Sequence, residues 1–135
     1  MARLCIFQVP NSNPPQFSVR NLDKKETAPA TSVPSPYEWP VPGAGDEKFM
    51  VQLRWYLETF LSYPHEPYTE RAARIEVALK AWGTAAFVAI FDNPAAKEWI
   101  SRQAGNALDI VISCDEPHIL AWPWEALHDP DRGYF

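Results

Sequence analysis

The side chains that could carry nucleophilic chemistry in this chain are two cysteines and three histidines. Cys5 and Cys114 could supply a thiolate, and His65, His118 and His128 could supply a base. Nucleophilic catalysis requires the thiol and the imidazole to be in contact. Only Cys114 and His118 are close in sequence, and a separation of four residues beyond a strand points two side chains apart more often than together. We therefore expect Cys114 to be a small buried hydrophobic residue at a strand end.

The same five residues do not have the spacing of a metal site. His65 lies in a proline turn, His118 follows Pro117, and His128 precedes Asp129-Pro130, so we interpret all three as surface or capping residues. The five glycines are scattered singly and form no phosphate-binding loop. We accordingly expect no metal site, no cofactor and no catalytic residue within this chain alone.

Glu125 is a carboxylate that stands among aromatic residues, in the run Trp122-Pro-Trp-Glu125. Buried there, it could act as a general acid. Alternatively, it could accept hydrogen bonds from backbone donors and hold a turn. Because no second carboxylate or nucleophile accompanies it, we favour the structural role.

Composition indicates a globular domain with a core, since 47% of the 135 residues are hydrophobic and 21% are charged. Residues 1–45 hold four basic and three acidic side chains, and residues 46–135 hold eight basic and fourteen acidic ones. The absence of a basic stripe argues against direct nucleic-acid binding. The apolar run at residues 1–10 is shorter than we expect of a signal peptide, and no stretch approaches the ~20 apolar residues that a membrane span needs. With only two cysteines, we expect a cytoplasmic protein with reduced thiols.

The positioning elements divide the chain into four parts. Residues 1–23 predict a β-hairpin, with Phe17, Val19 and Asn21 on one face of its second strand. Residues 24–45 form a proline-rich extended linker, which either docks into an aromatic groove of a partner or packs Tyr37 and Trp39 on its own domain.

Residues 46–105 predict three helices. Asp46 is the expected cap of the first, whose core face is Phe49, Leu53, Tyr56, Leu57, Phe60 and Leu61. The second, between Glu66 and Asp92, has a stripe of Tyr68, Ala72, Ile75, Leu79, Trp82, Ala86 and Ile90. Within it, Gly83 indicates the close approach of another element, a bend, or a junction of two helices. A short third helix starts at Pro94 and buries Ala96, Trp99 and Ile100.

Residues 106–135 open with a strand over 107–113, with Leu108, Ile110 and Ile112 on one face and Val111 on the other. Being apolar on both faces, it fits the interior of a sheet that is covered on both sides. The expected fold class is α/β, with an N-terminal hairpin and a helical layer packed on the first strands of a sheet.

The segment 115–135 resembles the opening of CHAT domains, which are caspase-like cysteine peptidases of the clan that includes caspases and separase. The matching positions are Pro123-Trp124-Glu125, Leu127, Asp129-Pro130 and Gly133-Tyr134. Trp122 and Ala126 replace leucines of the family pattern. The runs that start at Leu53 and Leu79, with Gly83, Ala86 and Phe87, also resemble the helical region before the CHAT core. The resemblance covers about residues 46–135.

The resemblance implies a caspase-like sheet and gives Pro123, Trp124, Glu125, Asp129, Pro130 and Gly133 the role of a structural elbow. In the family, the catalytic histidine and cysteine lie downstream of this elbow, so no catalytic role passes to any residue here. We therefore expect residues 106–135 to begin the core of an incomplete domain. The chain would be a truncated, an autoprocessed or an ordered part of a longer cysteine endopeptidase.

The resemblance further implies hydrolysis of protein substrates by a thiolate with a histidine partner, controlled by a partner protein or repeat domain in bacterial defence or signalling. The expected partner is the C-terminal protease portion. The alternative is a non-enzymatic interaction module that acts through a protein partner. A third interpretation is an inhibitory or regulatory prodomain.

Overall fold

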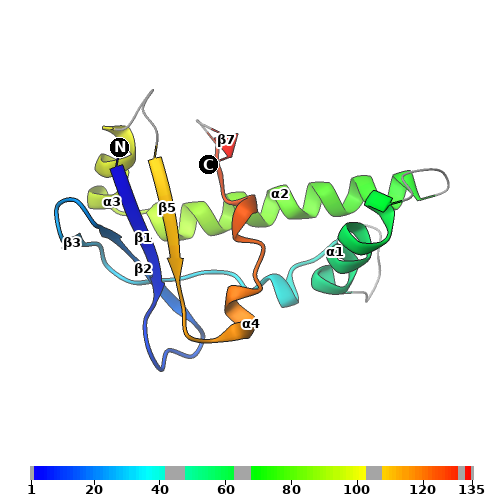
Figure 1. Cartoon of the computed structure of the whole chain (residues 1–135), viewed down its shortest axis with the longest axis horizontal. Helices are drawn as coiled ribbons and strands as arrows, with labels where there is room; N and C mark the ends of the chain where they lie inside the picture. The colour runs from blue at the N-terminus through cyan, green and yellow to red at the C-terminus, as the bar shows by residue number, and fades with distance from the viewer. Residues whose placement is uncertain (1, 42–47, 63–67, 103–107, 131–132, 135) are drawn as a thin grey trace.

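The computed structural model describes residues 2–41, 48–62, 68–102, 108–130 and 133–134 of the chain. In this part the fold is mixed α/β, with four α-helices and a main sheet of five strands. Strands β1 (Ala2–Gln8) and β2 (Gln16–Asn21) are antiparallel, and β5 (Leu108–Ser113) runs parallel to β1 (Figure 1). The predicted hairpin and mixed α/β class are confirmed.

One face of the hairpin forms the floor of the core. Leu4 and Ile6 of β1 and Phe17 and Val19 of β2 are at most 1% exposed, and Asn21 is also buried. The alternation of these residues is what strands packed on one face predict, and Ser18 on the other face of β2 is also buried. The hairpin therefore presents a continuous aliphatic and aromatic surface to the rest of the chain.

The proline-rich segment packs on its own chain. Short strands β3 (Glu26–Thr27) and β4 (Thr31–Ser32) pair with β2, and the 3-10 helix η1 (Pro36–Glu38) follows. The indole Nε1 of Trp82 donates to the Pro34 carbonyl at 2.8 Å, and the Tyr37 hydroxyl donates to the His118 carbonyl at 2.9 Å. Of the two interpretations of this segment, the structure shows the packing on the body.

Helix α1 (Phe49–Glu58) is followed by the 3-10 helix η2 (Phe60–Ser62). Phe49, Gln52 and Leu53 are buried, whereas Leu57 and Leu61 are more than half exposed, so placing these two leucines in the core was wrong. Helix α1 contacts α2 and η1, and Leu61 belongs to η2, none of whose residues is buried. The expected cap Asp46 is outside the described residues.

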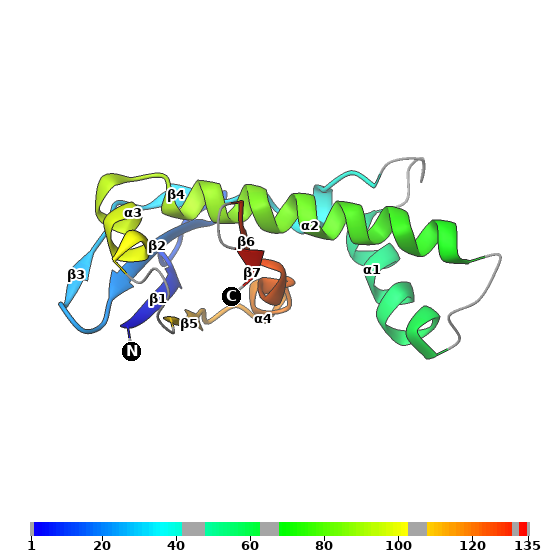
Figure 2. The same ribbon diagram turned by 90° about the horizontal axis from the view of Figure 1, so that it is seen from above.

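Helix α2 (Thr69–Phe91) is continuous through Gly83, which rules out a helix junction. Its predicted stripe is buried at Ala72, Ile75, Trp82, Ala86 and Ile90 and half-buried at Leu79, but Tyr68 is 47% exposed. Helix α1 and the N-terminal half of α2 extend together away from the sheet (Figure 2). Tyr68 belongs to this extension, where it packs edge-on against Trp55 instead of entering the core.

Helix α3 (Pro94–Ser101) starts as predicted. The Asn93 side chain accepts a hydrogen bond from the Ala96 amide at 2.8 Å, and Pro94 occupies the first turn. Ala96, Trp99 and Ile100 are buried. The Asn-Pro pair thus both ends α2 and caps α3.

Strand β5 does not lie inside the sheet, which corrects the expectation of a strand covered on both sides. In the described part of the chain it pairs with β1 alone, and the strand order is β3-β2-β1-β5. Val111 is 40% exposed, and its neighbours on the same face, Asp109 and Ser113, are exposed polar residues. One valine between two polar residues is the pattern of a strand packed on one face only.

After β5 the chain forms helix α4 (Pro117–Leu120), the 3-10 helix η3 (Trp124–Ala126) and a small hairpin of β6 (His128–Asp129) and β7 (Gly133–Tyr134). Helix α4 and the turn that follows it lie beside β5, on the side toward α1, in both views (Figures 1 and 2). Among the described residues, none of the helices is long and apolar enough to cross a bilayer.

Candidate functional site

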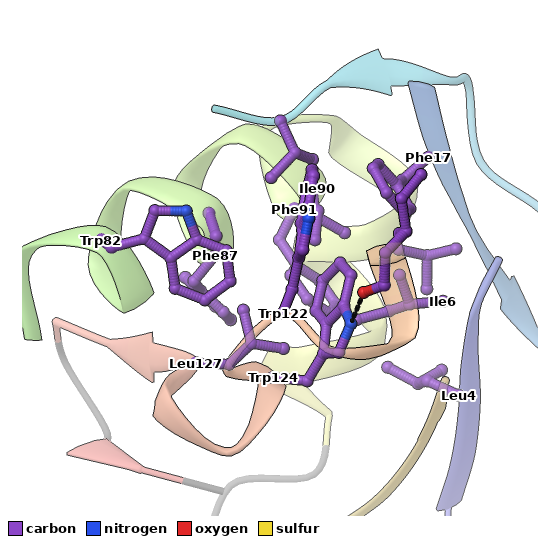
Figure 3. Close-up of a cluster of buried hydrophobic side chains, with 14 of the residues drawn as sticks. Leu4, Ile6, Phe17, Trp82, Phe87, Ile90, Phe91, Trp122, Trp124 and Leu127 are labelled. Atoms are coloured by element: carbon purple, nitrogen blue, oxygen red, sulfur yellow. Dashed lines mark hydrogen bonds between the residues drawn. The ribbon is translucent and has the colours of Figure 1, made fainter. Parts of the chain in front are cut away.

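The elbow, whose described residues are 123–130 and 133, is built around Trp124. Its indole Nε1 donates to the Ile119 carbonyl at 2.9 Å, which ties η3 back to α4 (Figure 3). The ring centroid lies 5.3 Å from that of Phe17, 6.0 Å from Trp82 and 5.5 Å from Trp122. The contacts with Phe17 and Trp82 are edge-on and that with Trp122 is stacked, and aromatic contacts of these kinds add to the burial energy of each ring. Trp124 therefore links the hairpin, α2 and the elbow in one cluster.

Gly83 of α2 lies directly against the elbow. A Cβ atom at this position would stand 1.8 Å from the carbonyl oxygen of Ala126, a distance that the backbone cannot accommodate. At the next residue of the helix, Thr84 Oγ1 lies 3.2 Å from His128 Nδ1. Of the three interpretations of Gly83, the structure shows the close approach of another element.

Glu125 points away from this cluster. The residue is exposed, although Trp124 and Ala126 on either side of it are buried. In a 3-10 helix, neighbouring side chains diverge by about a third of a turn, so Glu125 leaves the aromatic side. Of the two interpretations of Glu125, the general acid required a buried carboxylate, and the structure does not bury this residue.

The remaining elbow residues shape the turn. Pro123 precedes η3 as its N-cap residue, Asp129 is 5% exposed, and Pro130 is exposed. Asp129 and Gly133 are paired residues in the β6–β7 hairpin. The Asp-Pro and Gly-Tyr positions thus form the two sides of one short hairpin.

Cys114 follows the carboxyl end of β5 and His118 lies in α4, and the two are connected through Gln8 and Glu116. The Cys114 thiol donates to Gln8 Oε1 at 2.9 Å, and Gln8 Nε2 donates to Glu116 Oε1 at 3.2 Å. Glu116 Oε2 lies 3.2 Å from His118 Nε2. The thiol donates a hydrogen bond to an amide oxygen, and the imidazole contacts a carboxylate. The arrangement therefore does not provide a nucleophile activated by a base.

The other reactive side chains are separated from this network. Burial raises the pKa of the Cys5 thiol, and the Arg20 guanidinium offsets part of the rise. A raised pKa lowers the thiolate fraction and hence the reactivity of a cysteine. His128 contacts Thr84, as described above, and His65 lies outside the described residues. Within the described ranges, no three histidine, cysteine or carboxylate side chains are grouped to hold a metal.

A groove along the outer side of β5 was not anticipated from the sequence. It has a volume of about 400 Å³ and lies between β5 and η3. Leu108, Ile110 and Ile112 line it from the strand, and Trp124 and Leu127 line it from the elbow. The signal that could have indicated it is the polar pair Asp109 and Ser113, because a strand with one polar face suits a sheet edge.

The site thus consists of a buried aromatic elbow and an apolar groove at the edge of a mixed α/β sheet. Comparison with protein-family models, with curated proteins and with solved structures gives no match for this chain.

Proposed function

We propose that this chain is the N-terminal scaffolding portion of a CHAT-type, caspase-like cysteine endopeptidase. The observation that carries the proposal is the elbow. The residues that resemble the CHAT pattern fold into a packed turn that follows β5, a strand parallel to β1, with the short helix α4 between them. In this proposal, the elbow holds the strand that continues the peptidase core, and the catalytic cysteine and histidine lie outside residues 1–135.

The contacts of the elbow support a scaffolding role. Trp124 is buried and bonded to Ile119, and Gly83 allows the Ala126 backbone to lie against α2. A turn held from two sides fixes the direction of the chain that leaves it. Preorganisation of this kind keeps catalytic groups on a following strand in register.

The test begins with the intact mass under denaturing conditions and the reading frame on either side of residues 1–135. We expect a longer polypeptide with a His-Gly motif and a later cysteine. The complete protein should cleave protein substrates, and the variant Cys5→Ser/Cys114→Ala should keep this activity because neither thiol is catalytic. Replacing the downstream cysteine by alanine should abolish it. A reading frame that ends at Phe135, or the loss of cleavage in the double variant with unchanged folding, would contradict the proposal.

The second candidate is a non-enzymatic interaction module, which the apolar groove beside β5 favours. A lone module should bind a partner and cleave nothing. Assays of the same complete polypeptide for cleavage separate the two candidates.

A further inference from the structure

The outer edge of β5 is open in the described part of the chain. Its inner edge is paired with β1 over six residues, from Ala2↔Leu108 to Phe7↔Ser113. The outer backbone amides and carbonyls of a strand so placed are available for a further ladder. A partner strand that pairs with all six residues would be about 20 Å long, at roughly 3.3 Å per residue.

The apolar groove lies where side chains of such a strand would fall. Leu108, Ile110 and Ile112 are only half-buried, although they share a face with the fully buried Leu4 and Ile6 of β1. Every second side chain of an added strand would enter the groove between these residues and η3. The core therefore extends past the last strand, and an added strand would complete it.

The charges beside the edge select the chemistry of the partner. Both charged residues that line the groove, Asp109 and Glu125, are acidic and exposed. Arg3 is the paired residue of Asp109 on the β1 side, so an added strand meets Asp109 from the opposite direction. A second copy of the chain would bring the same carboxylates to the edge, and like charges close together across a ladder are destabilising.

We propose that the β5 edge binds an extended segment from outside residues 1–135, in which aliphatic side chains alternate with lysine or arginine. The aliphatic side chains enter the groove, and the basic ones lie on the face of Asp109. The backbone ladder supplies affinity, and the alternating side chains supply specificity, as in other strand additions. This inference rests on the geometry of the edge and goes beyond the proposed peptidase function.

The probe is an eight-residue peptide of alternating valine and lysine, blocked at both ends and titrated into the 135-residue chain. Tryptophan fluorescence reports on Trp124, which lines the groove, and hydrogen exchange reports on the β5 amides. We expect saturable binding with increased protection of β5. The matched valine–glutamate peptide should bind about tenfold more weakly, because electrostatic complementarity is reversed.

Two N-methylated forms of the probe test the backbone ladder. Methylation of the valine amides and methylation of the lysine amides block opposite edges of the peptide. We expect one form to lose binding and the other to keep it. Equal binding of both forms would show that charge alone attracts the peptide, and would overturn the proposal.

Charge-reversal variants test the side-chain specificity. Asp109→Lys/Glu125→Lys should reverse the preference, so that the valine–glutamate peptide binds more tightly. Glu58→Lys, at an exposed position on α1, is the matched control and should leave the preference unchanged. An unchanged preference in the double variant would contradict the assigned edge.

Two further outcomes are decisive. Binding that is undetectable at about 1 mM peptide would overturn the proposal, since even weak recognition would then be worth less than about 4 kcal/mol. Sedimentation that shows a dimer with protected β5 amides and no peptide would assign the edge to a second copy instead. Because the peptide assay does not depend on the reading frame, failure of the peptidase proposal leaves its result readable.

Discussion

Strands β1 and β5 are neighbours with the same alternating pattern, yet they differ in burial. Leu4 and Ile6 are paired with Ile110 and Ile112 in one parallel ladder. The two β1 residues are fully buried, whereas their β5 partners are half-buried. Strand β1 has strands on both sides, and β5 has a strand on one side only among the described residues. The burial of a strand residue therefore depends on the strands beside it as much as on the face of the sheet to which its side chain points.

The largest expected effect tests the cluster that covers both strands. Trp124→Ala should destabilise the fold by ~3–5 kcal/mol, as large aromatic truncations do in cores. Its ring packs on Phe17 and also lines the groove beside β5. Chemical denaturation measures the free energy of unfolding. A loss below about 1 kcal/mol would mean that the elbow does not organise the core.

The next prediction tests the comparison directly. Ile6→Ala should cost about 3–4 kcal/mol and Ile112→Ala about half as much, because the second site already exposes part of its side chain. The two residues are ladder partners, so the same substitution is compared at one level of the sheet. Equal losses of stability in urea denaturation would contradict the difference in burial between β1 and β5. A larger loss for Ile112→Ala in the presence of a bound strand would show that the added strand buries Ile112.

A smaller effect is expected at the contact that holds the elbow over α2. Gly83→Ala should destabilise by about 2–3 kcal/mol, although alanine is the better helix former, because its Cβ would meet the Ala126 carbonyl oxygen. The control Ala81→Gly, at an exposed position on the same helix, should lose about 1 kcal/mol from propensity alone. Thermal unfolding of both variants gives the difference. A stabilised Gly83→Ala would contradict the close approach.

A matched pair of tryptophans isolates one hydrogen bond. Trp124 donates to Ile119, whereas the buried Trp122 indole N–H has no hydrogen-bond partner among the described residues. Trp124→Phe should therefore cost about 1 kcal/mol more than Trp122→Phe, since only the former gives up a buried hydrogen bond. The Ile119 carbonyl keeps the bond from the Trp122 backbone amide in both variants. Denaturation curves of the two variants measure the difference. The reverse order would show that the indole contacts are assigned wrongly.

The smallest effect concerns the outer face of β5. Val111→Thr should change stability by less than about 0.5 kcal/mol, because the side chain is partly exposed and its hydroxyl can reach water. Val19→Thr, on the fully buried face of β2, should cost roughly 1–3 kcal/mol for the buried hydroxyl. Similar losses for the two variants would indicate that the Val111 face is covered in solution.

The sequence was a good guide where local chemistry decides the structure. Asn93-Pro94 predicted the start of α3, and alternation predicted the buried faces of β1 and β2. It was a poor guide where distant segments decide. The position of β5 at the edge depends on which strands lie beside it, and a single strand carries no record of that. Likewise, the exposure of Glu125 follows from a turn type that the aromatic neighbours did not indicate.

The elbow itself was predicted as a structural feature, but not its partners. Nothing in the local pattern around Trp124 names Phe17 or Trp82, which lie about 107 and 42 residues away in the chain. Gly83 did indicate a close contact, because a glycine inside a helix needs a reason. The identity of the contacting carbonyl came only with the fold.

The contact of the Ala126 carbonyl with Gly83 has a mechanical consequence. Helix α2 runs unbroken from Thr69 to Phe91, so the half that contacts α1 is a stiff arm of about 21 Å between Thr69 and Gly83, at 1.5 Å per residue. This arm contacts the elbow at Gly83, where the Ala126 carbonyl lies directly against the helix because no side chain separates them. A displacement of α1 at the far end would therefore be transmitted to the turn beside β5. The displacement at Gly83 would be smaller than the displacement of α1.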